Sequence, residues 1–402
     1  MLTVTPLSEA IQLAREHFGS LRTGRDFVDL TSALHRVLAE DICSDEFVPV
    51  FNRSTADGYA VRSSDVFGCS DSIPALLNIA GESKMGEHAG FVLQPGQCAI
   101  VPTGGEVPEG ADAVVMVEHT EDLGGGQVAI YKPVAPGADM IMRGEDTKPG
   151  DIILPAGRRI NAADIGALAA LGVTNIPVMR RPRVAVISTG DELITPAEKP
   201  APGQIRDVNT PLLYNAVLEA GGEPHELGFI RDNEDAITET VHKAAIEHDM
   251  VILTGSTSVG EKDAMPRVIG NLGRLLLHGI AVKPGKPTLF GEVNGVPVFG
   301  LAGNPVAAYF LFYNLVRPIL FSLQGAVPFD HQLTLPVSRS VPSNHGREEI
   351  VPVVVRDGRV HPVASKSGLI TTLADTDGFI RIPRELEGLR EGDLVQVTLF
   401  SR

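Results

Sequence analysis

Apolar runs alternate with helix-like segments through the middle of the chain. Residues 183–188 form a strongly apolar run, typical of a strand that is covered on both faces of a sheet. The same pattern predicts further strands near 225–230, 250–254, 275–282, 287–290 and 296–300, and helices at 211–220, 235–248 and 305–321. We expect Thr210 and Asn304 to cap the first and last of these helices. Such alternation predicts a mostly parallel sheet between two layers of helices.

The pattern differs on either side of this region. Helices are predicted at 8–18, 32–40 and 162–171, capped in the first case by Ser8 and in the last by Asn161. Between them, apolar and polar residues alternate from about residue 49 to residue 134, which predicts short β-strands. Because helical segments flank this β region on both sides, we interpret it as an insertion. From about residue 330 the pattern is again that of strands, including a hairpin with an Asp357-Gly358 turn, and predicts a small barrel or sandwich.

Composition restricts the class of protein. A chain of 402 residues is long enough for two or more domains. Its 34 Lys and Arg against 50 Asp and Glu give a net charge of −16, which disfavours nucleic acid as a partner. Any bound anion must therefore meet a local cluster of basic residues. The three cysteines fit neither a disulfide framework nor a zinc site. We expect no signal peptide and no run long enough to span a membrane. We therefore expect a soluble cytoplasmic protein.

Small-residue turns follow several of the predicted strands. Thr189-Gly190, Thr254-Gly255 and Gly300–Asn304 all come directly after strands of the central region. Ligands of parallel sheets bind beyond the carboxyl ends of the strands, so these turns are expected to meet at one edge. Backbone N–H groups at such turns suit a phosphate or another oxyanion. Nearby, Lys283 and Lys286 flank a stiff Pro-Gly pair that directs both ammonium groups toward one place.

Acidic residues near these turns are candidate ligands for a divalent cation. They are Asp191, Glu192, Asp232 and Asp263, with Asp57 and Asp146 farther along the chain. Carboxylates combined with phosphate oxygens are the ligands that Mg²⁺ prefers. Each acid also has a structural interpretation, since Asp232 and Asp263 could cap helices and Asp57 lies in an Asp-Gly turn. Further donors suited to an oxyanion are Arg347, Ser365, Lys366 and Ser367. No Ser-His-Asp set is evident in the sequence, so phosphoester or phosphoanhydride chemistry with Mg²⁺ is favoured.

These motifs occur in the order of one known family. They are Asn52-Arg-Ser-Thr-Ala-Asp-Gly-Tyr59, Thr103-Gly104, Arg143-Gly-Glu-Asp146, Ser188-Thr-Gly-Asp-Glu-Leu193, Ser258-Val-Gly-Glu-Lys-Asp263, Lys283-Pro-Gly-Lys-Pro287 and Gly303-Asn-Pro305. Over essentially its whole length the chain resembles the molybdopterin molybdenumtransferases, the family of MoeA and the gephyrin E domain. The resemblance implies an α/β multidomain fold with a central, mostly parallel molybdopterin-binding domain. We place its four parts at 20–48 with 138–178 (α+β linker domain), 49–137 (inserted β domain), 1–19 with 179–327 (α/β domain) and 328–402 (C-terminal β-barrel).

The resemblance also implies the reaction and the roles of residues. Adenylylated molybdopterin and molybdate would give molybdenum cofactor and AMP with Mg²⁺, in a cleft shared by the subunits of a homodimer. The α/β domain would hold the adenylylated pterin, through the strand-end residues Thr189, Gly190, Thr254, Gly255, Gly303 and Asn304. Asp263 and Glu192 would bind Mg²⁺, with Asp232 nearby, and Asp57, Thr103 and Asp146 would come from the partner. Molybdate would be held by Lys283, Lys286, Ser258, Arg347 and Ser367.

Some positions depart from the family pattern. Ser256 and Thr257 stand where Gly and a small or apolar residue are usual, Ala302 and Ala307 where Pro and Ser are usual, and Gly279 where some members have lysine. These differences bear on affinity and on the choice between molybdate and tungstate, rather than on fold.

Other functions are compatible with parts of this pattern. They are a tungstate-preferring paralogue, the related adenylyltransferase that activates the pterin, and a non-catalytic carrier of pterin or finished cofactor. The flanking β domains and the lysine loop favour the metal-inserting enzyme, and the retained acids disfavour a carrier. We further expect transient contacts with a pterin adenylyltransferase and with molybdoenzyme chaperones.

Overall fold

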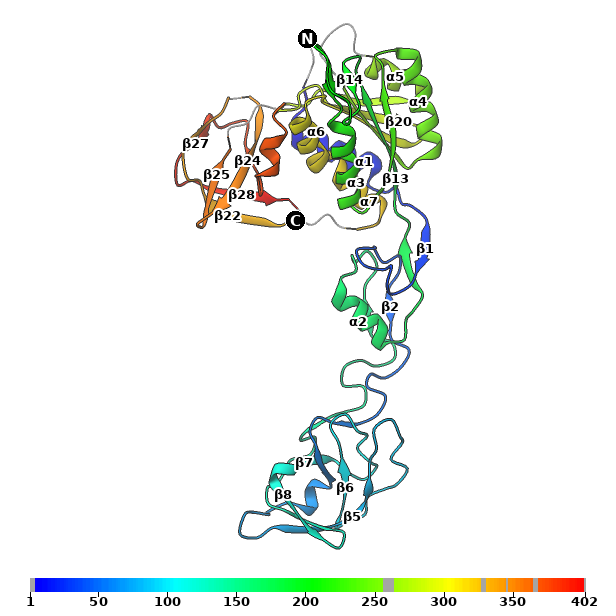
Figure 1. Ribbon diagram of the computed structural model, residues 1–402, viewed down its shortest axis with the longest axis vertical. Helices are drawn as coiled ribbons and strands as arrows, with labels where there is room; N and C mark the ends of the chain where they lie inside the picture. Colours follow the sequence, from blue (N-terminus) through cyan, green and yellow to red (C-terminus); the bar gives the residue numbers. More distant parts are fainter. Residues whose placement is uncertain (1–3, 256–263, 327–329, 345, 364–367, 401–402) are drawn as a thin grey trace.

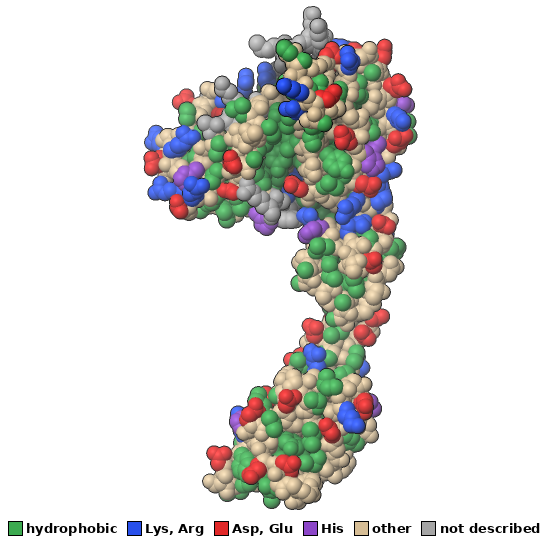
Figure 2. All heavy atoms as spheres, viewed as in Figure 1, with side chains coloured by type: hydrophobic (Ala, Val, Ile, Leu, Met, Phe, Trp, Pro, Cys, Tyr) green, Lys and Arg blue, Asp and Glu red, His purple; other side chains and the backbone are tan. Residues whose placement is uncertain are grey.

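The computed structural model shows an elongated, curved molecule (Figure 1). It describes residues 4–255, 264–326, 330–344, 346–363 and 368–400. A head at one end holds an α/β part and a C-terminal β part side by side. A small middle unit connects the head to a separate β unit at the far end. The space-filling view shows a narrow waist between the middle unit and the far unit (Figure 2).

The α/β part of the head is a six-stranded sheet with helices on both faces. Its strand order is β16 (Glu223–Ile230), β13 (Arg183–Thr189), β17 (Met250–Thr254), β21 (Val296–Leu301), β20 (Leu289–Val293) and β18 (Arg274–His278). The first four strands are parallel to one another, whereas β20 runs antiparallel to both of its neighbours. The predicted mostly parallel sheet is therefore confirmed.

Strand periodicity explains the two helical layers. Along β13, Val184 and Val186 are buried on one face, while Ala185 and Ile187 are buried on the other. The first face is covered by α1 (Leu7–Phe18), α3 (Asn209–Glu219), α6 (Pro305–Leu311) and α7 (Arg317–Leu323), and the second by α4 (Glu234–Glu247) and α5 (Met265–Leu272). Because both faces are buried, the strand reads as a continuous apolar run.

The helix at the end of the α/β part corrects one expectation. No run was expected to be long enough to span a membrane, yet residues 305–323 (α6, a π-helical stretch at Phe312–Val316, and α7) reach that length and mean hydropathy. In the structure 83% of this apolar stretch is buried inside the protein, as in the core helix of a globular domain.

The C-terminal part of the head is a small closed sheet. Its strands are β24 (Glu348–Arg356), β25 (Arg359–Pro362), β26 (Gly378–Ile382), β28 (Leu394–Leu399) and β22 (Gln332–Pro336). A bridge between Val337, directly after β22, and Val360 of β25 joins the two edges of this sheet, which closes a barrel. The predicted hairpin is confirmed, with φ of +51° at Asp357 and +68° at Gly358. One further strand, β19 (Val282–Lys283), reaches across from the α/β part and pairs with β24.

The far unit is a six-stranded β sheet with its own core. Its strands are β4 (Gly58–Val61), β5 (Ala75–Glu82), β6 (Gln97–Val101), β7 (Ala113–Met116), β8 (Thr120–Gly124) and β9 (Gln127–Ile130). Where the chain enters and leaves this unit, β3 (Arg53–Ser54) pairs with β10 (Met140–Ile141). The predicted β character of this insertion is confirmed.

The middle unit contains one helix where two were predicted. It consists of α2 (Ala162–Ala170) and two strand pairs, β1 (Arg25–Val28) with β12 (Ile176–Met179) and β2 (Ile42–Cys43) with β11 (Ile152–Leu154). Asn161 caps α2 as predicted, in a reciprocal capping box with Asp164.

The helix predicted at 32–40 does not form. Asp29 instead accepts hydrogen bonds from Thr31 Oγ1 and Ser32 N, which form a turn. His35 has a φ of +64°, which is incompatible with a right-handed helix. Ala33, Val37 and Leu38 of this segment are buried through turns and isolated bridges, whereas Leu34 is exposed. The predicted cap of α1 by Ser8 is also wrong, since the helix begins at Leu7, directly after Pro6, and has no side-chain cap.

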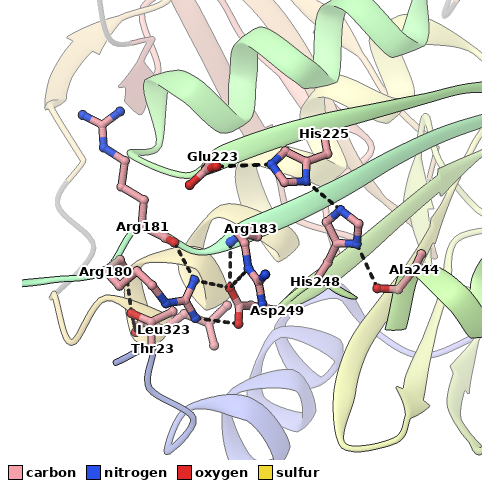
Figure 3. A network of polar contacts seen from close by, with 10 residues as sticks. All are labelled: Thr23, Arg180, Arg181, Arg183, Glu223, His225, Ala244, His248, Asp249 and Leu323. Atoms are coloured by element: carbon pink, nitrogen blue, oxygen red, sulfur yellow. Dashed lines mark hydrogen bonds and ion pairs between the residues drawn. The ribbon is translucent and has the colours of Figure 1, made fainter. Parts of the chain in front are cut away.

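A polar network lies in the α/β part, where the chain enters it directly after β12 of the middle unit (Figure 3). Arg180 donates to both carboxylate oxygens of Asp249 at 2.9 and 2.8 Å, and the Arg183 N–H donates to the same carboxylate at 2.7 Å. Beside it, buried His248 donates from Nδ1 to the Ala244 carbonyl and meets His225 Nδ1 through Nε2 at 2.8 Å. Burial would raise the pKa of Asp249, but the Arg180 and Arg183 contacts outweigh it and hold the pKa below its ordinary value. Burial lowers the pKa of His248.

The two shifts act in different pH ranges. The contribution of His248 is present above the pKa of an unfolded histidine, about 6.5, and is lost as pH falls below it, because the folded protein resists the proton. The contribution of Asp249 is lost only as pH falls below about 4. We therefore expect the free energy of unfolding to fall between about pH 7.5 and about pH 5.5, and His248→Gln to reduce this slope. Urea unfolding at several pH values measures it, with exposed His242→Gln on the same helix as the control. An unchanged slope in His248→Gln would contradict the assignment.

Candidate active site

Three strand-end turns meet at one edge of the α/β sheet. Thr189, at the end of β13, donates from Oγ1 to the carbonyl of Thr254 at the end of β17, at 3.2 Å. Gly255 has a φ of +93°, and a Cβ there would lie 1.9 Å from the Thr189 carbonyl oxygen. A Cβ on Gly303, after β21, would lie 3.4 Å from the Gly255 Cα. The predicted convergence is present in the structure, and a side chain larger than hydrogen is excluded at Gly255.

Acidic side chains lie beside these turns. The Glu192 carboxylate folds over Gly190, where a Cβ would lie 2.8 Å from Glu192 Oε2. Asp191 accepts from the backbone N–H of Asp232 at 3.3 Å, which joins the ends of β13 and β16. All three acids are exposed. Ser258 and Asp263 lie outside the described residues, and among those described no group of three or more His, Cys, Asp or Glu side chains is arranged to hold a metal ion.

A buried polar cluster beneath the turns was missed by the sequence reasoning. The Asp207 carboxylate accepts from Ser188 Oγ at 3.0 Å, from Thr210 N at 3.1 Å and from Thr210 Oγ1 at 2.5 Å. Ser188 Oγ also meets Thr254 Oγ1 at 3.1 Å. The expected cap by Thr210 is therefore wrong: Thr210 lies inside α3, and Asp207 satisfies its N–H. An acid at Asp207, three residues before Thr210 and just ahead of the helix start, was the available signal.

Asn209 links this cluster to the third turn. Its Nδ2 donates to the Gly303 carbonyl at 2.8 Å, and the side chain is 8% exposed. Its Oδ1 is buried without a hydrogen-bond partner among the described residues. Asn304, next to Gly303, occupies the cap position of α6 but makes no side-chain capping bond there.

The lysine loop lies between the two parts of the head. Through β19, Lys283 stands opposite Glu349 of β24, and its Nζ lies 2.9 Å from Glu349 Oε1. Gly285, with a φ of +115°, lets the loop approach α6, since a Cβ there would lie 2.7 Å from Leu311 Cδ1. Lys286 is half-buried. Arg347 is exposed just before β24, and Ser367 lies outside the described residues.

A cavity of about 680 Å³ adjoins this loop. Its lining includes Lys283, Glu349 and Arg339 together with apolar side chains of α6 and β24. Figure 2 shows the hollow between the two parts of the head, with hydrophobic side chains along it.

A second group of predicted residues lies in the far unit and in the segment that joins it to the middle unit. Asp57 accepts from Thr103 N at 2.7 Å and from Thr103 Oγ1 at 3.0 Å, and these bonds hold the pKa of Asp57 below its ordinary value. Asp146 is exposed in a turn that is tied to the Asp57 loop by a bond from Arg143 N to Asn52 Oδ1. Within one chain this group lies at the opposite end of the molecule from the strand-end turns (Figure 1).

Comparison with known proteins identifies the family. Residues 5–172 match the MoeA N-terminal region (domain I and II), residues 185–322 the "Probable molybdopterin binding domain", and residues 334–400 the MoeA C-terminal region (domain IV). The chain is 34% identical to the molybdopterin molybdenumtransferase of Bacillus subtilis, over 99% of this chain and 94% of that protein. The chain belongs to the MoeA family of molybdopterin molybdenumtransferases. It is thus an enzyme of molybdenum cofactor biosynthesis, as the motif order predicted.

Further relatives agree along the whole length. The molybdopterin molybdenumtransferase of Staphylococcus epidermidis is 32% identical over 92% of this chain and 90% of its own. The crystal structure of the MoeA protein of Pyrococcus horikoshii covers all of both chains at a TM-score of 0.88 and 36% identity. The multidomain MoeA architecture is therefore confirmed.

The departures from the family pattern are compatible with this fold. Gly279 has a φ of +99°, so a lysine at this position would require an unfavourable backbone conformation here. Ala302 and Ala307 are both buried, at 5% and 1% exposure.

Proposed function

We propose that the chain catalyses the final step of molybdenum cofactor biosynthesis. It inserts molybdate into adenylylated molybdopterin and releases AMP with the help of Mg²⁺. The observation that carries the proposal is the meeting of Thr189-Gly190, Thr254-Gly255 and Gly303 at one sheet edge, with carboxylates on one side. The turns suit the phosphoanhydride of the pterin nucleotide.

Glu192 and Asp263 would hold Mg²⁺, with Asp232 nearby. Among the described residues no group of three or more His, Cys, Asp or Glu side chains is arranged to hold a metal ion, so an ion bound here would take much of its coordination from phosphate oxygens and water. Bound there, Mg²⁺ would stabilise negative charge on the phosphoanhydride. The protein's own contribution is orientation: the Asp207 cluster fixes Ser188 and Thr254, and Asn209 fixes Gly303.

Molybdate is the oxyanion substrate. Lys283, Lys286 and Arg347 supply positive charge, and Ser258 and Ser367 supply hydroxyl donors. The pairing of β19 with β24 brings the lysine loop to the edge of the barrel near Arg347, which supports this assignment. A tetrahedral dianion held by ammonium and guanidinium groups gains charge-assisted hydrogen bonds.

The enzyme acts as a homodimer with shared sites. Asp57, Thr103 and Asp146 form their own group far from the strand-end turns of the same chain, which favours their contribution to the site of a partner subunit. We further propose that the enzyme works in the cytoplasm and makes transient contacts with the adenylyltransferase before it and the molybdoenzyme chaperones after it.

Asp263→Ala is expected to abolish Mg²⁺-dependent turnover while leaving fold and assembly intact. The substitution would remove a carboxylate from the metal and replace it with a small side chain that exposed and buried positions both tolerate. AMP release, circular dichroism and light scattering measure the three properties. Asp235→Ala, an exposed acid in the first turn of α4, is the matched control and should remain active. Full activity in Asp263→Ala would contradict the metal role.

A further inference from the structure

Lys283 already has an anionic partner within the protein. The parallel pairing of β19 with β24 places Lys283 directly opposite Glu349, and Nζ lies 2.9 Å from Oε1. The Glu349 side chain is only 17% exposed, whereas that of Lys283 is 50% exposed. The pair is therefore anchored on the carboxylate side and open to solvent on the ammonium side.

The Glu349 carboxylate is held in position from its other oxygen. Ser343 Oγ donates to Glu349 Oε2 at 2.7 Å. A carboxylate fixed by the Ser343 hydroxyl and by its strand loses little freedom when it meets the lysine, unlike a pair of two mobile surface side chains. Lys283 and Glu349 both line the cavity between the parts of the head.

We propose that Glu349 is a positioning residue that occupies Lys283 in the free enzyme and is exchanged for the oxyanion on binding. The proposal rests on the proposed function, in which Lys283 holds molybdate. An oxyanion that reaches Lys283 must replace the carboxylate as hydrogen-bond acceptor, and it meets the negative charge of Glu349 beside it. The carboxylate thus keeps Lys283 in place and lowers the affinity for the oxyanion, which favours its release to the pterin.

The neighbouring residue supplies a matched control. Glu348 points to the opposite face of β24, as alternation along a strand requires, and pairs with Arg381. Glu348→Gln therefore removes a carboxylate from the same strand without changing the partner of Lys283. Glu349→Gln keeps the size of the side chain and an acceptor for Ser343.

Equilibrium binding of tungstate tests the proposal, by calorimetry on the full-length protein at fixed ionic strength. Glu349→Gln should bind tungstate about tenfold more tightly than the unsubstituted protein, because a competing negative charge is gone. Glu348→Gln should bind as the unsubstituted protein does, and Lys283→Ala should bind far more weakly. In steady-state kinetics Glu349→Gln should lower the KM for molybdate without raising kcat. A loss of packing would not increase affinity.

Two other results would distinguish a failure of the proposed role of Glu349 from a failure of the proposed oxyanion site. Unchanged or weaker binding in Glu349→Gln, together with lost binding in Lys283→Ala, would overturn the role of Glu349 and leave the proposed function standing. Unchanged binding in Lys283→Ala would place the oxyanion elsewhere, and would overturn both the role of Glu349 and the assigned oxyanion site.

Discussion

Gly255→Ala is expected to destabilise the head by about 3 kcal/mol or more and to abolish binding of the pterin nucleotide. The new Cβ would lie 1.9 Å from the Thr189 carbonyl oxygen, which is backbone and has no rotamer to change. The φ of +93° adds strain for any residue other than glycine. Relief would require the turns after β13 and β17 to separate, and these are the turns proposed to hold the phosphoanhydride. Urea unfolding and nucleotide binding measure the two effects.

Gly166→Ala is the matched control. Gly166 lies inside α2, and a Cβ there meets nothing within 4 Å. The exchange should stabilise the protein slightly, by about 0.5–1 kcal/mol, because alanine favours the helix. Equal stability of Gly255→Ala and the unsubstituted protein would mean that the turns are not rigid against each other.

Two inactive variants are expected to restore activity when they are combined in one dimer. Lys283→Ala damages the head and Asp57→Ala damages the far unit. If each site takes its head from one subunit and its far unit from the other, a heterodimer of the two variants has one intact site. It should show about half of the unsubstituted activity. Heterodimers purified through two different affinity tags provide the measurement.

The reciprocal heterodimer makes the result unambiguous. When both substitutions lie in one subunit and the partner is unsubstituted, every shared site carries one damaged part, so this dimer should be inactive. Sites built within single subunits would give the opposite pattern, with activity only in the second heterodimer. That pattern would contradict the shared site.

The sequence predicted those features that depend on local periodicity. Buried strands such as β13 read as apolar runs because both faces are covered, and the Asp357-Gly358 turn is encoded by residues that accept positive φ. The helix predicted at 32–40 was wrong because the apolar residues there have helical spacing, while the turn at Asp29 and the positive φ of His35 give the backbone a different path. Turn chemistry outweighed periodicity there.

Long-range contacts could not be predicted in this way. The pairing of Lys283 with Glu349 depends on the register between β19 and β24, which belong to different parts of the head. The joining of Asp207 to Ser188 likewise depends on the packing of α3 against the sheet. The motifs placed the strand-end turns correctly, but the groups that hold those turns became visible only in three dimensions.

Release of AMP from adenylylated molybdopterin tests the central claim most directly. It is measured with and without Mg²⁺, and with molybdate, tungstate or neither oxyanion. We expect release that requires both Mg²⁺ and an oxyanion, and the more effective oxyanion then identifies the metal that the enzyme inserts. Tight binding of the pterin nucleotide without release under any of these conditions would contradict the transferase activity and favour a carrier.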